Sequence, residues 1–165
     1  MSHERLLASI IDLDGVASVR VADVYDATAA ELWATITRPE RLANWVAVVE
    51  GQLRVGGQFH AVFTSGWEGE GRIEACEPHR RLQLTMNPDA DRESTVEATL
   101  ESQGDRTRLV ISEQGLPLAL APGLAAGWQV HFEDLSAAVA GGTGTGWKRR
   151  WAELSKPYDD LAAGS

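Results

Sequence analysis

Two side chains in the sequence combine acid–base chemistry with apolar surroundings, Glu113 and His131. Glu113 follows Leu109 and Ile111 at a spacing of two, which predicts that it lies on the apolar face of a strand. A carboxyl group buried there has a raised pKa and can give or take a proton. The strand could equally end at this point and leave Glu113 in water. If Glu113 and His131 face each other, they are the best acid–base pair in the chain.

His131 belongs to an apolar stripe that recurs every three or four residues between residues 120 and 139. This spacing is typical of an amphipathic helix. In one interpretation His131 is a polar anchor that orients a ligand inside a cavity. In the other it is a core histidine whose hydrogen bond is satisfied by the protein itself.

The other reactive residue types form no motif that indicates chemistry. His3, His60, His79 and His131 lack the spacing of metal ligands. The glycines of GGTGTGW do not complete a phosphate-binding loop, and they indicate a linker. Cys76 is the single cysteine, so it cannot form an internal disulfide. We therefore expect no metal and no cofactor, and a binding protein more than an enzyme.

Composition narrows the possible partners. The chain has 165 residues and a formal net charge of -9. Nucleic-acid binders carry a basic surface that neutralises phosphates, so we expect no nucleic-acid partner. The sequence contains no apolar run of the ~20 residues that cross a bilayer, and its first residues lack a signal-peptide pattern. The expectation is a cytoplasmic protein without membrane insertion.

Apolar and polar residues alternate with a period of two in several stretches, which predicts strands. These stretches are residues 16–25, 59–64, 67–75, 81–86, 93–101 and 108–112. Alternation of this kind is typical of an antiparallel sheet with one face in water. Thr28 with Glu31 forms a capping box, and Pro39 opens another turn, so two short helices are expected after the first strand.

The apolar face of such a sheet needs a cover, and the helix at 120–139 is the one element long enough. The predicted fold class is α+β, with a curved antiparallel sheet wrapped around a long C-terminal helix. We expect a domain over residues 1–142, with its core at about 16–140, and a helical extension of it over 143–165. The aromatic stripe of the extension packs either on its own domain or on a second copy in a homodimer.

Aromatic residues and small residues on the inner faces predict a cavity between sheet and helix. Gly69 and Gly71 lie on the inner face of one strand, where small residues leave space. The side chains expected to bind a ligand there are Trp45, Phe59, Phe63, Trp67, Met86, Trp128, His131 and Phe132. A closed and filled core is the alternative interpretation of the same residues.

An ordered set of short motifs resembles the START-like, or SRPBCC, superfamily. The motifs are LWATITRPERLANW at 32–45, LRVGGQF at 53–59, GRI at 71–73, EPHRRL at 77–82, TRL at 107–109 and GW at 127–128. More narrowly, they are similar to the bacterial relatives of the activator of the ninety-kilodalton heat-shock-protein ATPase. The resemblance implies a helix-grip fold with a hydrophobic cavity. Members of the superfamily include lipid carriers, polyketide cyclases, hormone receptors and co-chaperones.

We therefore expect the chain to bind a small apolar or amphipathic molecule between the sheet and the long helix. The first alternative is a cyclase- or dehydratase-type enzyme that uses His131 and Glu113. The second is a co-chaperone-like module that interacts with another protein.

Overall fold

A computed structural model describes residues 5–88, 91, 93–144 and 146–164. The strands are β1 (Ala8–Leu13), β2 (Val16–Tyr25), β3 (Ala47–Gly51), β4 (Gln58–Phe63), β5 (Glu68–Glu77), β6 (Arg81–Met86), β7 (Ser94–Gln103) and β8 (Arg106–Pro117). The helices are α1 (Ala29–Thr37), α2 (Pro39–Leu42), α3 (Ala121–Val139) and α4 (Trp147–Ala163), with a 3-10 turn, η1 (Leu118–Leu120), before α3.

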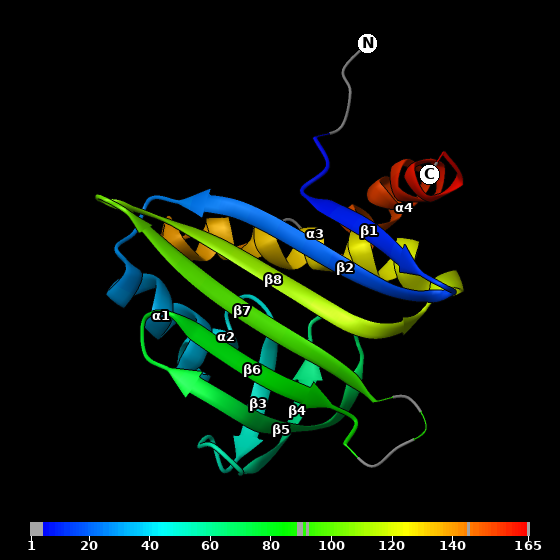
Figure 1. Cartoon of the computed structure of the whole chain (residues 1–165). Helices are drawn as coiled ribbons and strands as arrows, with labels where there is room; N and C mark the ends of the chain where they lie inside the picture. The colour runs from blue at the N-terminus through cyan, green and yellow to red at the C-terminus, as the bar shows by residue number, and fades with distance from the viewer. Residues whose placement is uncertain (1–4, 89–90, 92, 145, 165) are drawn as a thin grey trace.

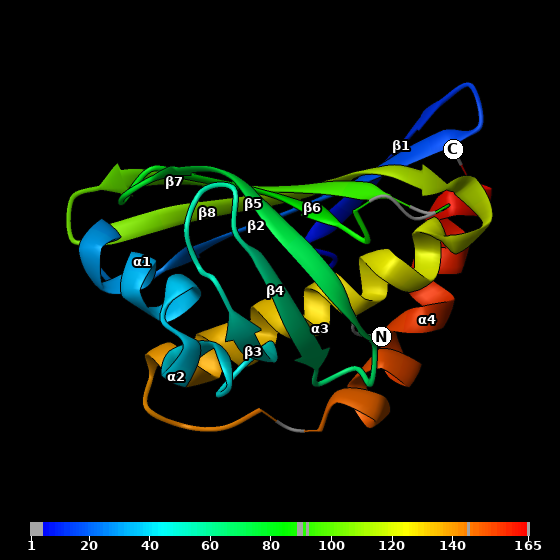
Figure 2. The same cartoon turned by 90° about the horizontal axis from the view of Figure 1, so that it is seen from below.

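The strands form one eight-stranded antiparallel sheet in the order β1-β2-β8-β7-β6-β5-β4-β3. The sheet is open, with β1 at one edge and β3 at the other. It curves around α3, and α4 lies beside one end of α3 (Figures 1 and 2). This arrangement confirms the predicted α+β class and the helix-grip fold.

Two strands were not expected from the sequence, β1 and β3, and they lie at the two edges of the sheet. Each edge strand has one neighbouring strand, and most of its side chains are partly or fully exposed. A strand with few buried side chains shows little alternation of apolar and polar residues, and this alternation is the pattern that predicts a strand from sequence. Because β1 precedes β2, the two short helices follow the second strand rather than the first.

The two short helices begin where the sequence predicts. Thr28 accepts a hydrogen bond from the backbone N–H of Glu31, and the Glu31 carboxylate accepts one from the N–H of Thr28. Pro39 occupies the first turn of α2, which ends at Leu42. The indole N–H of Trp45 then donates to the backbone carbonyl of Thr35 at 3.0 Å. This bond ties the segment after α2 back to α1 and holds the Trp45 ring inside the protein.

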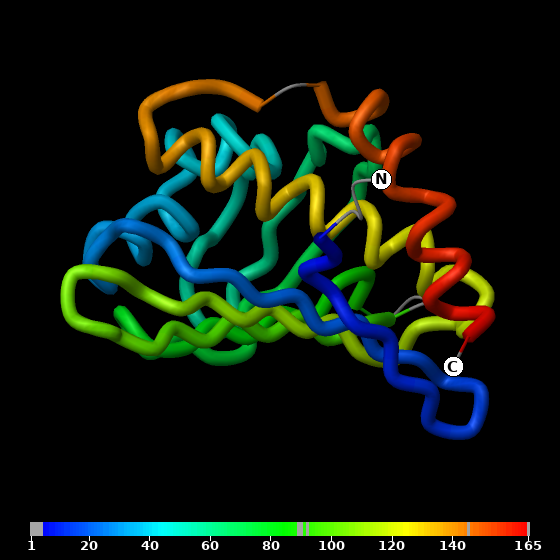
Figure 3. Tube along the Cα trace, turned by 90° about the horizontal axis from the view of Figure 1, so that it is seen from above, coloured from blue at the N-terminus to red at the C-terminus, as the bar shows by residue number. Residues whose placement is uncertain are grey.

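Helix α4 packs on α3, and the hydroxyl of its Tyr158 accepts a hydrogen bond from the backbone of Ala8 in β1 (Figure 3). Leu154 and Tyr158 on its inner face are fully buried, so the aromatic stripe of the extension packs on its own domain. The side chain of Arg150 forms two hydrogen bonds with the carboxylate of Glu133 on α3, at 2.7 and 2.9 Å. Pro157 lies inside α4, which runs from Trp147 to Ala163 as one helix.

Gly69 and Gly71 of β5 do not create the empty space that the sequence predicted beside them. A Cβ atom at Gly71 would overlap the ring of Phe59, and one at Gly69 would overlap the ring of Trp67. The two aromatic rings therefore cover the glycines, an arrangement known to stabilise sheets at such positions. The empty space of the molecule lies elsewhere.

Candidate ligand-binding site

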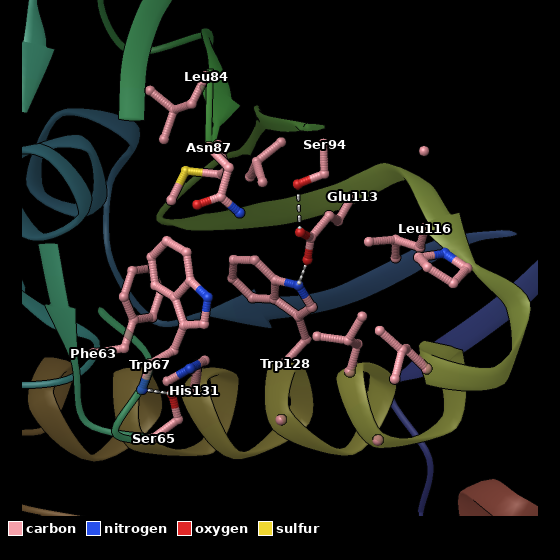
Figure 4. Close-up of a pocket in the computed structure, with 18 of the residues that line it drawn as sticks. Phe63, Ser65, Trp67, Leu84, Asn87, Ser94, Glu113, Leu116, Trp128 and His131 are labelled. Atoms are coloured by element: carbon pink, nitrogen blue, oxygen red, sulfur yellow. Dashed lines mark hydrogen bonds between the residues drawn. The ribbon is translucent and has the colours of Figure 1, made fainter. Parts of the chain in front are cut away.

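A cavity of about 310 Å³ lies between α3 and the inner face of the sheet. Its walls come from the turn between β4 and β5, from β6, β7 and β8, and from α3. Trp147, the first residue of α4, adds a further part of the wall. Most of the lining side chains are apolar, and the polar ones include Ser94, Glu113 and His131. Figure 4 shows these three with the aromatic rings of Phe63, Trp67 and Trp128.

A second cavity of about 160 Å³ adjoins the first below α1 and α2. Five side chains line both cavities: Phe63, Leu84, Met86, Val96 and Trp128. None of the side chains that line the second cavity is charged. The two spaces are thus separated by apolar side chains.

The eight predicted ligand-binding residues lie in the larger cavity, in the smaller cavity or in the core outside both. Phe63, Trp67, Met86, Trp128 and His131 line the larger cavity, and Trp45 and Phe59 line the smaller one. Phe132 lines neither, because a step of one residue turns a helix by about 100° away from His131. Its buried ring packs at 6.1 Å from the ring of Tyr25, in the core behind the cavity wall.

Glu113 lies in the middle of the hydrogen-bonded part of the sheet and does not end its strand, since β8 continues to Pro117. Its two carboxylate oxygens accept separate hydrogen bonds (Figure 4). The hydroxyl of Ser94 donates at 2.8 Å and the indole N–H of Trp128 at 2.9 Å. Both oxygens act as acceptors, which is the arrangement that suits an ionised carboxylate.

His131 is 5% exposed and is enclosed by aromatic rings. Its ring centroid lies 5.8 Å from that of Phe63, 5.7 Å from that of Trp128 and 6.0 Å from that of Trp147. Burial lowers the pKa of His131 from its usual 6.5 to about 4, with a smaller opposing effect from a hydrogen bond with the backbone of Trp45. The imidazole is therefore neutral near pH 7.

One nitrogen of His131, Nδ1, has no hydrogen-bond partner, and neither does the indole nitrogen of Trp147. The second interpretation of His131, a core histidine satisfied by the protein, therefore does not account for Nδ1. A buried polar atom without a partner costs about 1–3 kcal/mol.

Glu113 and His131 line the same cavity, but they form no hydrogen bond with each other in the part of the chain that the structure describes. Trp128 contacts both, since its indole N–H bonds Glu113 and its ring packs on His131 one helical turn further along. The pair is therefore bridged by an indole that is no proton carrier.

Among the lining residues that the sequence analysis did not name, Ser94 contacts Glu113 and Trp147 contacts His131. Ser94 precedes Val96 by two positions, so the period-two pattern of that strand already places it on the inner face. Trp147 belongs to the aromatic stripe of the helical extension, but the sequence does not reveal which element that stripe packs on. The structure places its ring against Gly127 of α3, where an added Cβ would lie 3.4 Å from the indole.

Comparison with known proteins agrees with this geometry. The family described as Activator of Hsp90 ATPase homolog 1-like protein, AHSA1, matches residues 26–140. The chain belongs to the AHSA1 family. This confirms the resemblance inferred from the motifs, and with it the START-like, or SRPBCC, superfamily. Among curated proteins, no match to this chain was found.

Several solved structures share the fold of this AHSA1 chain. The crystal structure of CalU16 from Micromonospora echinospora has 25% identity and a TM-score of 0.77, with 94% of this chain and 95% of that chain covered. CV1439 from Chromobacterium violaceum has 26% identity and a TM-score of 0.63, covering 74% and 96%. DynU16, from the dynemicin biosynthetic locus, has 24% identity and a TM-score of 0.71, covering 79% and 49%.

The AHSA1 match ends at residue 140, so the cavity wall supplied by Trp147 lies outside the matched region. The described residues contain no cluster of three or more histidine, cysteine, aspartate or glutamate side chains that could hold a metal ion. Nor does any described helix have the length and apolar character needed to cross a membrane.

Proposed function

We propose that this AHSA1-family chain binds a small hydrophobic or amphipathic molecule in the cavity between the sheet and α3. The observation that supports this most directly is the cavity of about 310 Å³ itself, walled by aromatic and aliphatic side chains with a few polar groups. Ligand sites in proteins are typically apolar spaces of about 300–1,000 Å³ in which a few polar groups fix the orientation. The volume favours a ligand at the small end of this range.

The chemistry of the walls supports binding without a reaction. An apolar ligand removes its surface, and that of the rings of Phe63, Trp67 and Trp128, from water, which yields about 25 cal/mol for each Å² buried. Adjustment of the five shared side chains would let a longer ligand extend into the second cavity. Glu113 and His131 then orient the ligand.

A thermal-shift screen of lipids and aromatic compounds tests the proposal, together with native mass spectrometry of the purified protein. We expect compounds that raise the melting temperature, or a small molecule that remains bound. Leu84→Trp fills space shared by both cavities and should abolish these shifts. Val62→Trp is the matched control, because Val62 is 42% exposed on the outer face and lines neither cavity. Shifts that survive in Leu84→Trp would place binding elsewhere.

The cyclase- or dehydratase-type alternative has one observation in its favour, which is that Glu113 and His131 line one cavity. It predicts that His131→Ala abolishes turnover of an aromatic polyketide-like substrate while the fold is retained. Turnover that is unchanged in this variant would exclude the histidine from the reaction. The co-chaperone-like module also stays a prediction, and its measurement is stimulation of the ATPase of a bacterial heat-shock partner.

A further inference from the structure

Glu113 is the one charged residue among those that line either cavity in the described chain. Among the described residues, no lysine or arginine is present in either wall. The two donors that hold Glu113, Ser94 and Trp128, are both neutral. Within the part of the chain that the structure describes, the negative charge in the larger cavity is therefore solvated by hydrogen bonds and is not neutralised.

An unpaired charge in apolar surroundings is unfavourable, and pairing it with an opposite charge recovers part of that free energy. Each carboxylate oxygen has about two acceptor sites, and each oxygen of Glu113 uses one of them for Ser94 or Trp128. Acceptor capacity therefore remains on both oxygens. A ligand group that donates hydrogen bonds and carries a positive charge would use it best.

Aromatic rings surround the same space. Phe63, Trp67 and Trp128 all line the cavity together with Glu113 (Figure 4). The face of an aromatic ring attracts a cation, most strongly when both are shielded from water. A carboxylate combined with aromatic rings is a suitable environment for an ammonium group. The rest of the apolar wall suits a hydrophobic body attached to that group.

We propose that the ligand of this cavity is an amphipathic amine, whose protonated amino group pairs with Glu113 while its apolar body fills the space between α3 and the sheet. This inference rests on the proposed function and narrows its ligand class. A fatty acid or another carboxylate would bring a second negative charge to Glu113, and the described residues of the wall include no cation to receive it. The net charge of -9 acts in the same direction, because it attracts cations and repels anions at a distance.

Three probes that share a naphthalene ring test the charge preference. They are naphthylmethylamine, which is positively charged, naphthylmethanol, which is neutral, and naphthaleneacetate, which is a carboxylate; the last is called the acetate below. Their affinities for the full chain are measured by isothermal titration calorimetry at low and at moderate salt. We expect the amine to bind at least about tenfold more tightly than the alcohol, since a hydrogen bond in which both donor and acceptor are charged is stronger than the bond of a neutral hydroxyl to the same carboxylate. The acetate should bind more weakly than the alcohol.

Glu113→Gln tests the residue, because it removes the charge and keeps the size and an oxygen that can accept from Trp128. The amine should lose about tenfold or more in affinity, the alcohol should change by less than about threefold, and the acetate should bind more tightly than before. Glu101→Gln removes an exposed carboxylate of β7 as a matched control for net charge, and the order of affinities should not change. Glu113→Asp keeps the charge and should keep the preference for the amine.

The outcomes separate this inference from the proposed function. If none of the three probes binds, and the wider screen finds no ligand that Leu84→Trp blocks, the proposed function fails. If the alcohol or the acetate binds as tightly as the amine, the cavity is a binding site but the amine inference is wrong. An amine preference that persists unchanged in folded Glu113→Gln would also overturn it, because the preference would then come from another group.

Discussion

The indole N–H of Trp128 donates a 2.9 Å hydrogen bond to the carboxylate of Glu113 and so joins α3 to β8 across the larger cavity. The bond holds the carboxylate at the cavity wall and fixes the orientation of the tryptophan ring, which packs on His131. The side chains that define the site are thus held in position by each other as well as by their elements.

Trp128→Phe should lower the free energy of unfolding by about 1–3 kcal/mol, because a partly buried carboxylate loses one of its two donors. Urea unfolding measures the loss. In a Glu113→Gln background the same change should cost at least about 0.5 kcal/mol less, since the residues are in direct contact. Strictly additive effects of the two substitutions would contradict the importance of this bond.

Protonation of His131 should destabilise the fold as the pH falls. Its pKa is about 4 in the folded chain and near 6.5 when the chain is unfolded, so between these values the unfolded chain binds the extra proton. Stability contributed by the neutral imidazole is present in full above pH 6.5 and is lost progressively down to about pH 4. A shift of this size corresponds to about 3 kcal/mol.

The variant His131→Leu isolates this contribution. Other groups titrate in the same window, including Asp134, whose pKa burial and neighbouring Glu133 raise to about 6. The measured quantity is therefore the difference between wild type and variant in urea unfolding at pH values from 7 to 4. The wild type should lose about 3 kcal/mol more than the variant over this range. Parallel curves would mean that the histidine is not buried as described.

The sequence predicted elements whose residues face the core on one side. Thr28 and Glu31 marked the start of α1, and the alternation around Leu109 and Ile111 placed Glu113 on the inner face of β8. The alternation of apolar and polar residues did not predict edge strand β1, because most of its side chains are partly or fully exposed. Local pattern thus reveals burial, but it does not reveal which surface an element covers.

The site was predicted less completely for the same reason. A helical stripe contains both His131 and Phe132, yet only His131 reaches the cavity, and Phe132 packs on Tyr25. Whether space remains at Gly71 depends on the ring of Phe59, which comes from the neighbouring strand. Packing between elements decides these positions, and no single segment of sequence contains that information.

Gly71→Ala should destabilise the protein by about 1–3 kcal/mol, because the new methyl group overlaps the Phe59 ring. Thermal or urea unfolding measures the effect. Phe59→Leu in the same chain removes the ring and should cancel most of the additional cost of the alanine. If Gly71→Ala costs the same in both backgrounds, the ring does not cover the glycine.

Tyr158 joins the C-terminal helix to the first strand and to α3. Its hydroxyl accepts from the backbone N–H of Ala8 at 2.9 Å and donates to the side chain of Gln129. Tyr158→Phe leaves the buried N–H of Ala8 without its partner, while Oε1 of Gln129 still accepts from the N–H of Leu7, and the change should cost about 1–3 kcal/mol. Amide hydrogen exchange in β1 should become faster than in the rest of the sheet. Tyr25→Phe, which removes a hydroxyl bonded to the backbone of Phe132, should destabilise the chain without this selective effect on β1.

Trp147 completes the cavity wall from a helix that lies beyond the residues that match the AHSA1 family. The sheet and α3 form the scaffold, and α4 is attached to it mainly through α3 and through a hydrogen bond between Tyr158 and the first strand. Substitutions of Trp147 can therefore alter the shape of the site without removing the contacts of Arg150, Leu154 and Tyr158 that attach α4 to the scaffold. Related proteins with different C-terminal helices would then accept different ligands on the same fold, so selectivity could evolve separately from folding.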